Sequence, residues 1–302
     1  MNRRNFLLNG ALTLGALALG KYTSFASTFD FAAAYNVKML TDKVGVFTEQ
    51  GGTILFLLSK AGIVVVDSQF PDPANHLIED LKKRTEKPFD LLINTHHHGD
   101  HTSGNIAFKG LVNHLVAHEN SAINQKRVAE DGIKAGRKVV EQYYPDQAFT
   151  KDWKYKIGGD HIKAYYFGAG HTNGDAMIHF EDQNVVHMGD LVFNRRYPFI
   201  DKTAGANIKS WIEVLDKAKD TFGSKTQYVF GHAFEPEKIV GNQDDLSAFQ
   251  NYLEKLLEFV SKEMKAGKTN EEILRATQIP GAEEWRGDGI GRSLTAAIAE
   301  LS

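Results

Sequence analysis

The sequence predicts an α+β domain in which a sandwich of mixed β-sheets is flanked by helices. Short apolar stretches typical of strands alternate with helical stretches in both halves of the chain. The 302 residues are 42% hydrophobic, which is sufficient for one sizeable core. No Pro/Ser-rich linker interrupts residues 27–302, so we expect one domain that ends in helices.

The first half of the chain contains four predicted strands and two predicted helices. The strands are short apolar or β-branched runs at residues 53–58, 63–67, 91–94 and 115–118. The helices are predicted at residues 71–84 and 119–140. Gly132 and Gly136 fall inside the second of these, and we expect the helix to be broken near them.

The second half repeats this style without repeating the sequence. Strands are predicted at residues 162–167, 176–180, 185–188 and 228–230. Helices are predicted at residues 208–222 and 246–265, and two shorter ones within 270–301. The apolar side chains of helix 246–265 recur at helical spacing, which core packing or a dimer face explains. The oligomeric state stays open.

The first 26 residues are typical of an export signal rather than of the folded domain. Arg3 and Arg4 precede an apolar run from Phe6 to about Gly20, which is short for a membrane span. Small residues follow at 24–26, where a signal peptidase would cut. The paired arginines resemble a twin-arginine signal, which predicts a periplasmic protein that meets the membrane only during export. A membrane anchor or a buried helix is the alternative.

Charge and cysteine content restrict the possible chemistry. The net charge of -3 argues against a nucleic-acid partner, which would favour a strongly basic protein, and a small-molecule substrate is expected instead. The chain has no cysteine, so it has no disulfide and no thiolate nucleophile or ligand. Any metal site must therefore be built from His, Asp and Glu.

A dense cluster of such residues follows the apolar strand at 91–94. It reads Thr95-His96-His97-His98-Gly99-Asp100-His101. A loop that contains glycine, placed at a strand end, can turn several side chains into one small volume. Neutral imidazoles and carboxylates are the ligands that zinc takes when thiolates are absent. An exposed histidine-rich turn is the alternative.

The run from His96 to His101 resembles the His-x-His-x-Asp-His signature of the metallo-β-lactamase superfamily. Three later segments are similar to further signatures of that family, in its order: Gly170-His171-Thr172, Gly189-Asp190-Leu191-Val192-Phe193 and Gly231-His232. The resemblance covers roughly residues 37–234. It implies a four-layer αββα sandwich with metal ions at the edge between the two sheets.

The resemblance also implies a ligand set like that of glyoxalase II. A first metal ion would be held by His96, His98 and His171, and a second by Asp100, His101 and His232, with Asp190 bridging the two. Two zinc ions are expected, with iron or manganese as alternatives. Such a pair lowers the pKa of a shared hydroxide, which attacks the substrate. Asp100 is the expected catalytic residue, orienting that hydroxide and relaying a proton.

Other polar residues near these motifs permit two interpretations each. His97 is expected to point away from the metals, because its neighbours on both sides are ligands. Asp67 either orients a ligand histidine or begins a turn. Arg195, Arg196 and Tyr197 follow Asp190 closely and either grip the substrate or form a solvated loop with salt bridges.

The predicted function is hydrolysis of an ester, thioester, lactone or lactam, or phosphoester bond by a metal-bound hydroxide. A periplasmic metallo-β-lactamase is the first alternative: the export signal favours it, whereas a bridging Asp190 argues against it. The lack of cysteine excludes the β-lactamase subclasses that need a cysteine ligand. An iron-dependent oxidoreductase on the same scaffold and a non-catalytic binding module are further alternatives.

Overall fold

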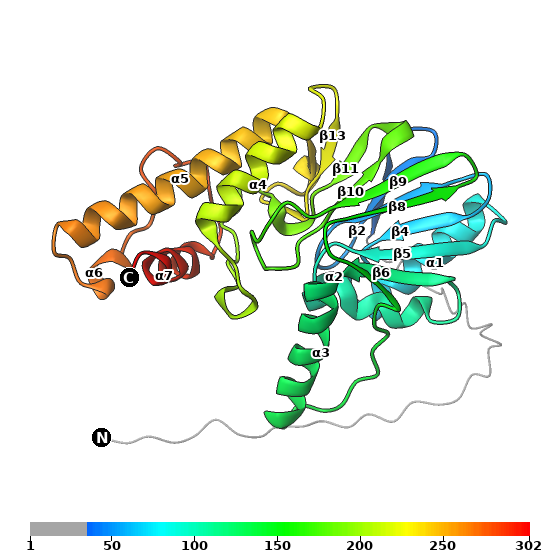
Figure 1. Ribbon diagram of the computed structural model, residues 1–302, viewed down its shortest axis with the longest axis horizontal. Coiled ribbons are helices and arrows are strands. Elements are labelled where there is room, and N and C mark those ends of the chain that lie inside the picture. The colour runs from blue at the N-terminus through cyan, green and yellow to red at the C-terminus, as the bar shows by residue number, and fades with distance from the viewer. Residues whose placement is uncertain (1–34) are drawn as a thin grey trace, which may run out of the picture. The chain divides into compact units, whose positions relative to one another are not determined.

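Two β-sheets stacked face to face form the centre of the protein (Figure 1). The structure, a computed structural model, describes residues 35–302. The first sheet has the order β1-β2-β3-β4-β5-β6-β7. Its strands are β1 Asn36–Met39, β2 Val44–Thr48, β3 Ile54–Leu58, β4 Ile63–Val66, β5 Phe89–Asn94, β6 His114–His118 and β7 Gln147–Phe149. The strands from β1 to β4 pair antiparallel, and those from β4 to β7 pair parallel.

The second sheet has the order β15-β13-β11-β10-β9-β8. Its strands are β8 Asp152–Ile157, β9 Asp160–Tyr165, β10 Met177–Phe180, β11 Val185–His187, β13 Gln227–Val229 and β15 Val240–Gly241. A separate parallel pair joins β12 Phe193–Asn194 to β14 His232–Ala233 and sets Phe193 opposite His232. The chain thus alternates between antiparallel hairpins and parallel crossovers, as a mixed-sheet sandwich requires.

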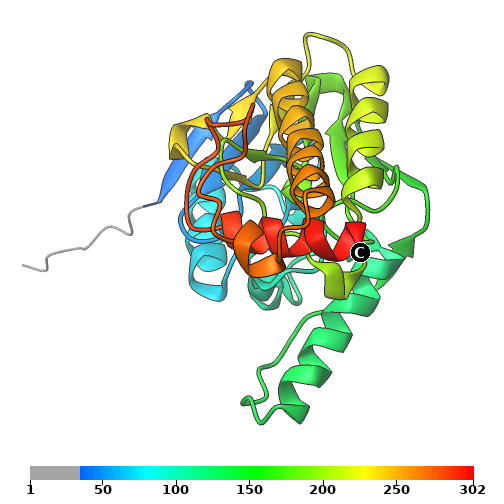
Figure 2. The same cartoon turned by 90° about the vertical axis from the view of Figure 1, so that its left-hand side faces the viewer.

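Helices cover both outer faces of the two sheets (Figures 1 and 2). The α-helices are α1 Pro71–Arg84, α2 Gly99–Thr102, α3 Glu119–Lys134, α4 Ile208–Thr221, α5 Gln243–Lys265, α6 Asn270–Ile273 and α7 Ile290–Leu301. Short 3-10 helices are η1 Ser103–Phe108, η2 Glu181–Gln183, η3 Gly189–Leu191, η4 Lys202–Ala204 and η5 Pro236–Lys238. Among residues 35–302, no helix combines the length and the hydropathy needed to cross a membrane.

Three apolar layers hold the sandwich together. One fills the space between the two sheets and includes Val64, Ile93 and Ile178. A second lies between the first sheet and α1, and a third lies between the second sheet and helices α4, α5 and α7. Three apolar layers separate four layers of secondary structure, so the predicted αββα sandwich is confirmed.

The helices follow their sequence patterns closely, with one exception. Helix α4 buries residues at helical spacing, among them Trp211 and Leu215, and α5 begins at a capping box formed by Asn242 and Asp245. Helix α3 was predicted to reach residue 140 with a break near Gly132 and Gly136, but it continues through Gly132 and ends at Lys134. Gly136 has a φ of 78° just beyond that end, a left-handed conformation that terminates the helix.

Strands β1, β2, β7, β8, β12, β14 and β15 were not predicted from the sequence. Most are short, and β8 buries only its last residue, Ile157, so its pattern lacks the apolar run that identifies an inner strand. Residues 35–302 form one compact unit. Within it, α3 extends away from the sheets, which Figure 2 shows most clearly. Residues 1–26, the predicted export signal, lie outside the described residues.

Candidate metal centre

The side chains that the sequence indicates as metal ligands converge at one edge of the sandwich. Several come from the loop after β5 and from α2, where the chain turns at the end of a buried strand. The others come from the loop after β9, from η3 and from the start of β14. In chain order they are His96, His98, Asp100, His101, His171, Asp190 and His232.

Three histidines form the first cluster. The Nδ1 atom of His98 lies 3.2 Å from Nε2 of His96 and 2.8 Å from Nε2 of His171. Asp190 joins them, with its Oδ2 atom 3.4 Å from Nε2 of His171 and 3.8 Å from that of His96. These four donor atoms lie within 4.8 Å of one another, close enough for a single ion to contact all of them.

The second cluster uses the other oxygen of Asp190. Its Oδ1 atom lies 3.0 Å from Nε2 of His101 and 3.5 Å from Nε2 of His232. Asp100 completes this group, since its Oδ2 atom is 3.1 Å from Nε2 of His232. One carboxylate, buried to 4% exposure, therefore presents one oxygen to each cluster.

Two glycines allow the chain to pass this close to the clusters. A Cβ atom at Gly52 would collide with the ring of His101, and one at Gly231 would collide with the carboxylate of Asp190. Gly231 directly precedes His232, so the same peptide that supplies one ligand leaves room for another. Any side chain at either position would displace a donor group.

Hydrogen bonds on the outer side of the rings fix which nitrogen of His171 and which nitrogen of His98 faces inward. Nδ1 of His171 lies 2.7 Å from the carbonyl oxygen of Phe199, and Nε2 of His98 lies 2.9 Å from Asp201. A carbonyl and a carboxylate only accept, so these outer nitrogens carry the proton. In the neutral rings the inner nitrogens then carry lone pairs that point at one another. A bound cation would remove the repulsion between these lone pairs.

Asp67 organises both clusters from beneath. It accepts a hydrogen bond from Nδ1 of His101 at 2.8 Å, which leaves Nε2 of His101 free for a ligand role. It also accepts from the backbone and hydroxyl of Thr95, each at 2.8 Å. The Thr95 hydroxyl in turn lies 3.0 Å from Nδ1 of His96. Of the two interpretations of Asp67, the structure supports the orienting one.

The electrostatics of the two clusters differ. Burial, with the charge of the neighbouring histidines, lowers the pKa of His171 to about 3 and that of His96 well below its usual value. In the second cluster burial also lowers the pKa of His232, but the negative charges of Asp190 and Asp100 outweigh burial and raise that pKa to about 9. The same two carboxylates and Asp67 raise the pKa of His101 well above 6.5 against burial.

The second cluster fits a metal ion on an observation independent of family resemblance. Nε2 of His101 and Oδ1 of Asp190 are buried and have no hydrogen-bond partner within residues 35–302, although they lie 3.0 Å apart. Unsatisfied buried donors and acceptors are rare and call for an ion or a water. A set of imidazoles and carboxylates without sulfur suits zinc, iron or manganese.

A pocket of about 360 Å³ opens onto both clusters. Asp100, Asp190 and His232 form its floor, and Arg196 and Tyr197 lie in its wall. The third residue predicted for substrate binding, Arg195, is not brought there. Its guanidinium lies 3.7 Å from a carboxylate oxygen of Asp245 and 4.0 Å from one of Glu284.

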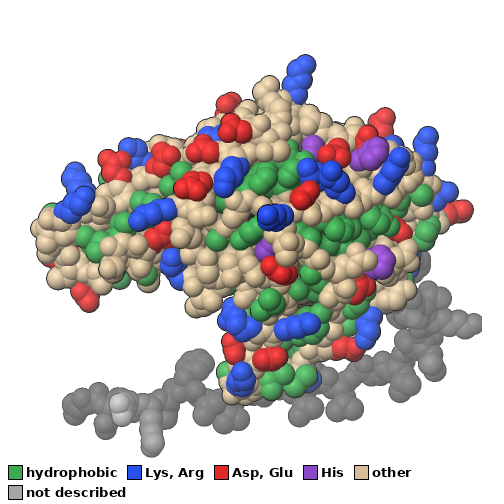
Figure 3. Space-filling view, in the orientation of Figure 1, with side chains coloured by type: hydrophobic (Ala, Val, Ile, Leu, Met, Phe, Trp, Pro, Cys, Tyr) green, Lys and Arg blue, Asp and Glu red, His purple; other side chains and the backbone are tan. Residues whose placement is uncertain are grey.

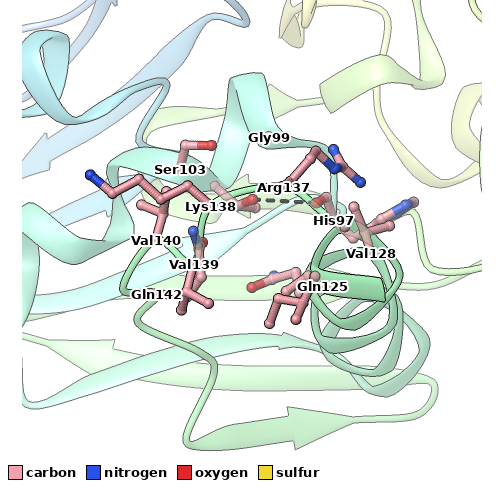
Figure 4. Close-up of a pocket in the computed structure, with 14 residues that line it drawn as sticks. His97, Gly99, Ser103, Gln125, Val128, Arg137, Lys138, Val139, Val140 and Gln142 are labelled. Carbon is pink, nitrogen blue, oxygen red and sulfur yellow. Dashed lines mark hydrogen bonds between the residues drawn. The ribbon is translucent and has the colours of Figure 1, made fainter. Parts of the chain in front are cut away.

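His97 faces away from both clusters into a second pocket of about 290 Å³, between α2, α3 and the segment after α3 (Figure 4). Its side chain is buried, and neither ring nitrogen has a hydrogen-bond partner among residues 35–302. Burial lowers its pKa to about 3, so the ring is neutral. Exposed apolar residues line the same pocket, including Val139 and Val140. Figure 3 shows apolar side chains on the projecting part of the protein that contains α3.

Comparison with known proteins identifies the family. The family model of the metallo-β-lactamase superfamily matches residues 48–232, which contain every residue of the two clusters. The chain belongs to the metallo-β-lactamase superfamily. It is accordingly an enzyme, a metallo-hydrolase with a metal-binding cluster of His and Asp.

The relatives of this superfamily enzyme are distant. It is 25% identical over 194 residues to metallo-β-lactamase IND-1 of Chryseobacterium indologenes, covering 62% of this chain and 75% of the relative. It is 24% identical over 206 residues to the type 2 metallo-β-lactamase of Bacillus cereus, covering 65% and 76%.

Solved structures share the fold of this superfamily enzyme. A metallo-β-lactamase from Pontibacter korlensis matches with a TM-score of 0.60 at 23% identity, over 73% of this chain and 99% of that one. The sec-alkyl sulfatase PisA1, a double mutant, matches with a TM-score of 0.69 at 14% identity, over 88% of this chain and 50% of that one.

Sequence reasoning missed Asp201 and Arg292. Asp201 accepts a hydrogen bond from Nε2 of His98. It lies directly before η4, where no sequence motif marks it. Arg292 lies in α7 and reaches the metal-site pocket only because that helix packs beside the loop after β12. Such partners depend on tertiary packing over about a hundred residues of chain, which local patterns do not record.

Proposed function

We propose that the protein is a dinuclear metal-dependent hydrolase, with zinc as the expected metal. The observation that carries the proposal is the placement of Asp190, which directs one oxygen to each cluster. His96, His98 and His171 would hold the first ion, and Asp100, His101 and His232 the second. When bound, the two ions would supply an activated water and polarise the substrate oxygen.

The protein's own groups then have separable roles. Asp100 is the least buried of the cluster carboxylates, with 32% of its side chain exposed, and it borders the open pocket. Burial is outweighed by His101 and His232, which hold the pKa of Asp100 near 2, so it is a carboxylate at neutral pH. We assign Asp100 the catalytic role of orienting the water and accepting its proton. Asp67 and Asp201 position ligand histidines.

The proposed bond is that of an ester, thioester, lactone, lactam or phosphoester. A β-lactam is the second candidate because several relatives are named metallo-β-lactamases. An iron-dependent oxidoreductase is a third candidate, since the donor set also suits iron. We further propose, from the sequence of residues 1–26, that the protein is exported to the periplasm, which fractionation of expressing cells would test.

Metal analysis and a substrate panel test the proposal. We expect close to two metal ions in each chain by mass spectrometry, and zinc-dependent hydrolysis of at least one of nitrocefin, a lactone, a thioester or a phosphodiester. Chelation should abolish that activity and zinc should restore it. One ion even with excess zinc, or an iron-loaded coloured protein without hydrolytic activity, would reject the dinuclear hydrolase.

The two metal sites should respond differently to pH. His96 and His171 are already neutral because their pKa values are lowered, whereas His101 and His232 bind protons because theirs are raised. A metal ion must displace those protons, so binding at the second site weakens as pH falls below about 9. We expect about tenfold or more weakening of the second zinc-binding event per pH unit and a shallower slope for the first.

Calorimetric zinc titrations between about pH 6 and about pH 8 would measure both slopes. Repeating them in buffers of different ionisation enthalpy would count the protons released at each event. Equal slopes for the two events would contradict the difference between the clusters.

A further inference from the structure

Two arginines without acidic partners lie in the wall of the metal-site pocket. Arg196 belongs to the loop after β12 and Arg292 to the first turn of α7, and both line the pocket with Asp100, Asp190 and His232. Both side chains are exposed, and neither guanidinium forms a salt bridge or a side-chain hydrogen bond within residues 35–302. They are the cations that face this pocket without compensation from a carboxylate of their own.

The neighbouring Arg195, in the same loop, lies close to acidic side chains of the protein. Its guanidinium has Asp245 and Glu284 within 4.0 Å and lies 5.0 Å from the centre of the Trp285 ring. The next residue, Arg196, lacks such partners and points to the pocket instead. The loop thus turns one arginine toward the protein's acids and the other toward the metal site.

Arg292 occupies an unfavourable position for a cation. The N-terminal turn of a helix carries partial positive charge, which favours acidic side chains, and the first turn of α7 contains none. The guanidinium lies 5.6 Å from the centre of the Phe199 ring, and that ring lies 5.4 Å from the ring of His98. This contact places the exposed guanidinium of Arg292 beside a ring that, like Arg292 itself, lines the metal-site pocket.

The two arginines belong to one preformed rim. The backbone of Arg286 accepts a hydrogen bond from Tyr197 and donates one to Arg195, each at 3.0 Å. The buried hydroxyl of Ser293, next to Arg292, donates to the carbonyl oxygen of Pro198 at 3.0 Å. The Ser293 bond ties the loop after β12 to the start of α7, and the Arg286 bonds tie the same loop to the segment before α7, so the backbone positions of the two arginines are held together.

We propose that Arg196 and Arg292 bind an oxyanion of the substrate that is remote from the cleaved bond. The substrate class is therefore an anionic ester, amide or phosphoester whose carboxylate, sulfonate or phosphate group the two guanidinium groups grip. Planar guanidinium groups suit such oxygens because each can donate two parallel hydrogen bonds. This inference rests on the hydrolase proposed above and specifies which of its possible substrates it takes.

A kinetic test compares matched substrates that differ only in charge. Two aryl esters with the same leaving group would carry either a carboxylate or its amide at the far end. Each of Arg196→Gln and Arg292→Gln should raise KM for the anionic ester about tenfold, with kcat nearly unchanged, and leave the amide ester unaffected. Arg275→Gln is the control, because it removes an exposed arginine outside the pocket.

A binding test works without turnover. Calorimetry on zinc-treated protein would compare glutarate with its half-amide, and with the corresponding sulfonate and phosphonate. We expect the double variant Arg196→Gln/Arg292→Gln to bind glutarate at least about tenfold more weakly than the wild type, and the half-amide equally well. The sulfonate and phosphonate arms show which oxyanion the arginines prefer.

The outcomes separate the two proposals. Equal glutarate binding by the wild type and the double variant would overturn the arginine assignment, whatever the activity. An inactive wild type whose glutarate binding still depends on both arginines would reject the hydrolase and leave the anion site standing. A loss of binding in Arg275→Gln as large as in the double variant would reduce the effect to net charge and overturn the assignment.

Discussion

Replacing Asp190 by asparagine is expected to remove one metal ion and to lower turnover by about a hundredfold or more. Asparagine has nearly the same shape, but its amide has one oxygen and no charge. It can face only one of the two clusters that Asp190 now joins through separate oxygens. The repulsion between two dications also loses its shared anion. Metal content by mass spectrometry, with the rate on the best substrate of the panel, measures both effects.

Folding should survive in this variant, because the three apolar layers do not involve Asp190. Asp175→Asn offers a comparison in the same half of the protein. That carboxyl is also buried, but it accepts from Thr172 and lies outside both clusters, so its replacement should leave two ions bound. Two tightly bound ions and a normal rate in Asp190→Asn would show that Asp190 does not bridge the ions. The β-lactamase-like site, which lacks this bridge, would then become the first candidate.

Asp67→Ala should have the largest effect on stability. The carboxylate has no exposed surface and accepts from the Thr95 backbone, the Thr95 hydroxyl and His101. Its removal leaves these buried donors unpaired, and alanine must also adopt the left-handed φ of 65°. We expect the free energy of unfolding to fall by about 3 kcal/mol or more, measured by denaturant unfolding of the metal-free protein.

Two further variants complete this measurement. Asp67→Asn tolerates the left-handed backbone and keeps one acceptor, so it should lose clearly less stability while still weakening metal binding. Asp152→Ala removes an exposed aspartate on β8 and should change the free energy of unfolding by less than about 0.5 kcal/mol. Wild-type stability in Asp67→Ala would mean that the residue only begins a turn.

The sequence predicted the parts of this protein that depend on local pattern. The apolar run before His96 and the glycine-containing loop after it were sufficient to place a ligand cluster at a strand end, and the structure has β5 there. The helical spacing in α4 and α5 was equally readable, because each buries one continuous face. These features need only neighbours within about two helical turns.

The parts that were left open or escaped prediction depend on partners distant in the chain. The sequence allowed two interpretations of Asp67, and only the parallel pairing of β4 with β5, which brings Asp67 to His101, decides between them. Arg292 joined the pocket through the contact of α7 with the loop after β12. Helix α3 was extended too far because a glycine inside a helix and one beyond its end look alike in the sequence.

The division of the metal centre between the two sheets has a consequence for the order of folding. The loop after β5 belongs to the first sheet, whereas His171, Asp190 and His232 follow strands of the second. Neither half of the chain holds a complete set of donors around Asp190, and the apolar layer between the sheets must close before the clusters exist. We therefore expect metal binding to be a late step of folding, because a bound ion would need donor groups from both halves of the chain.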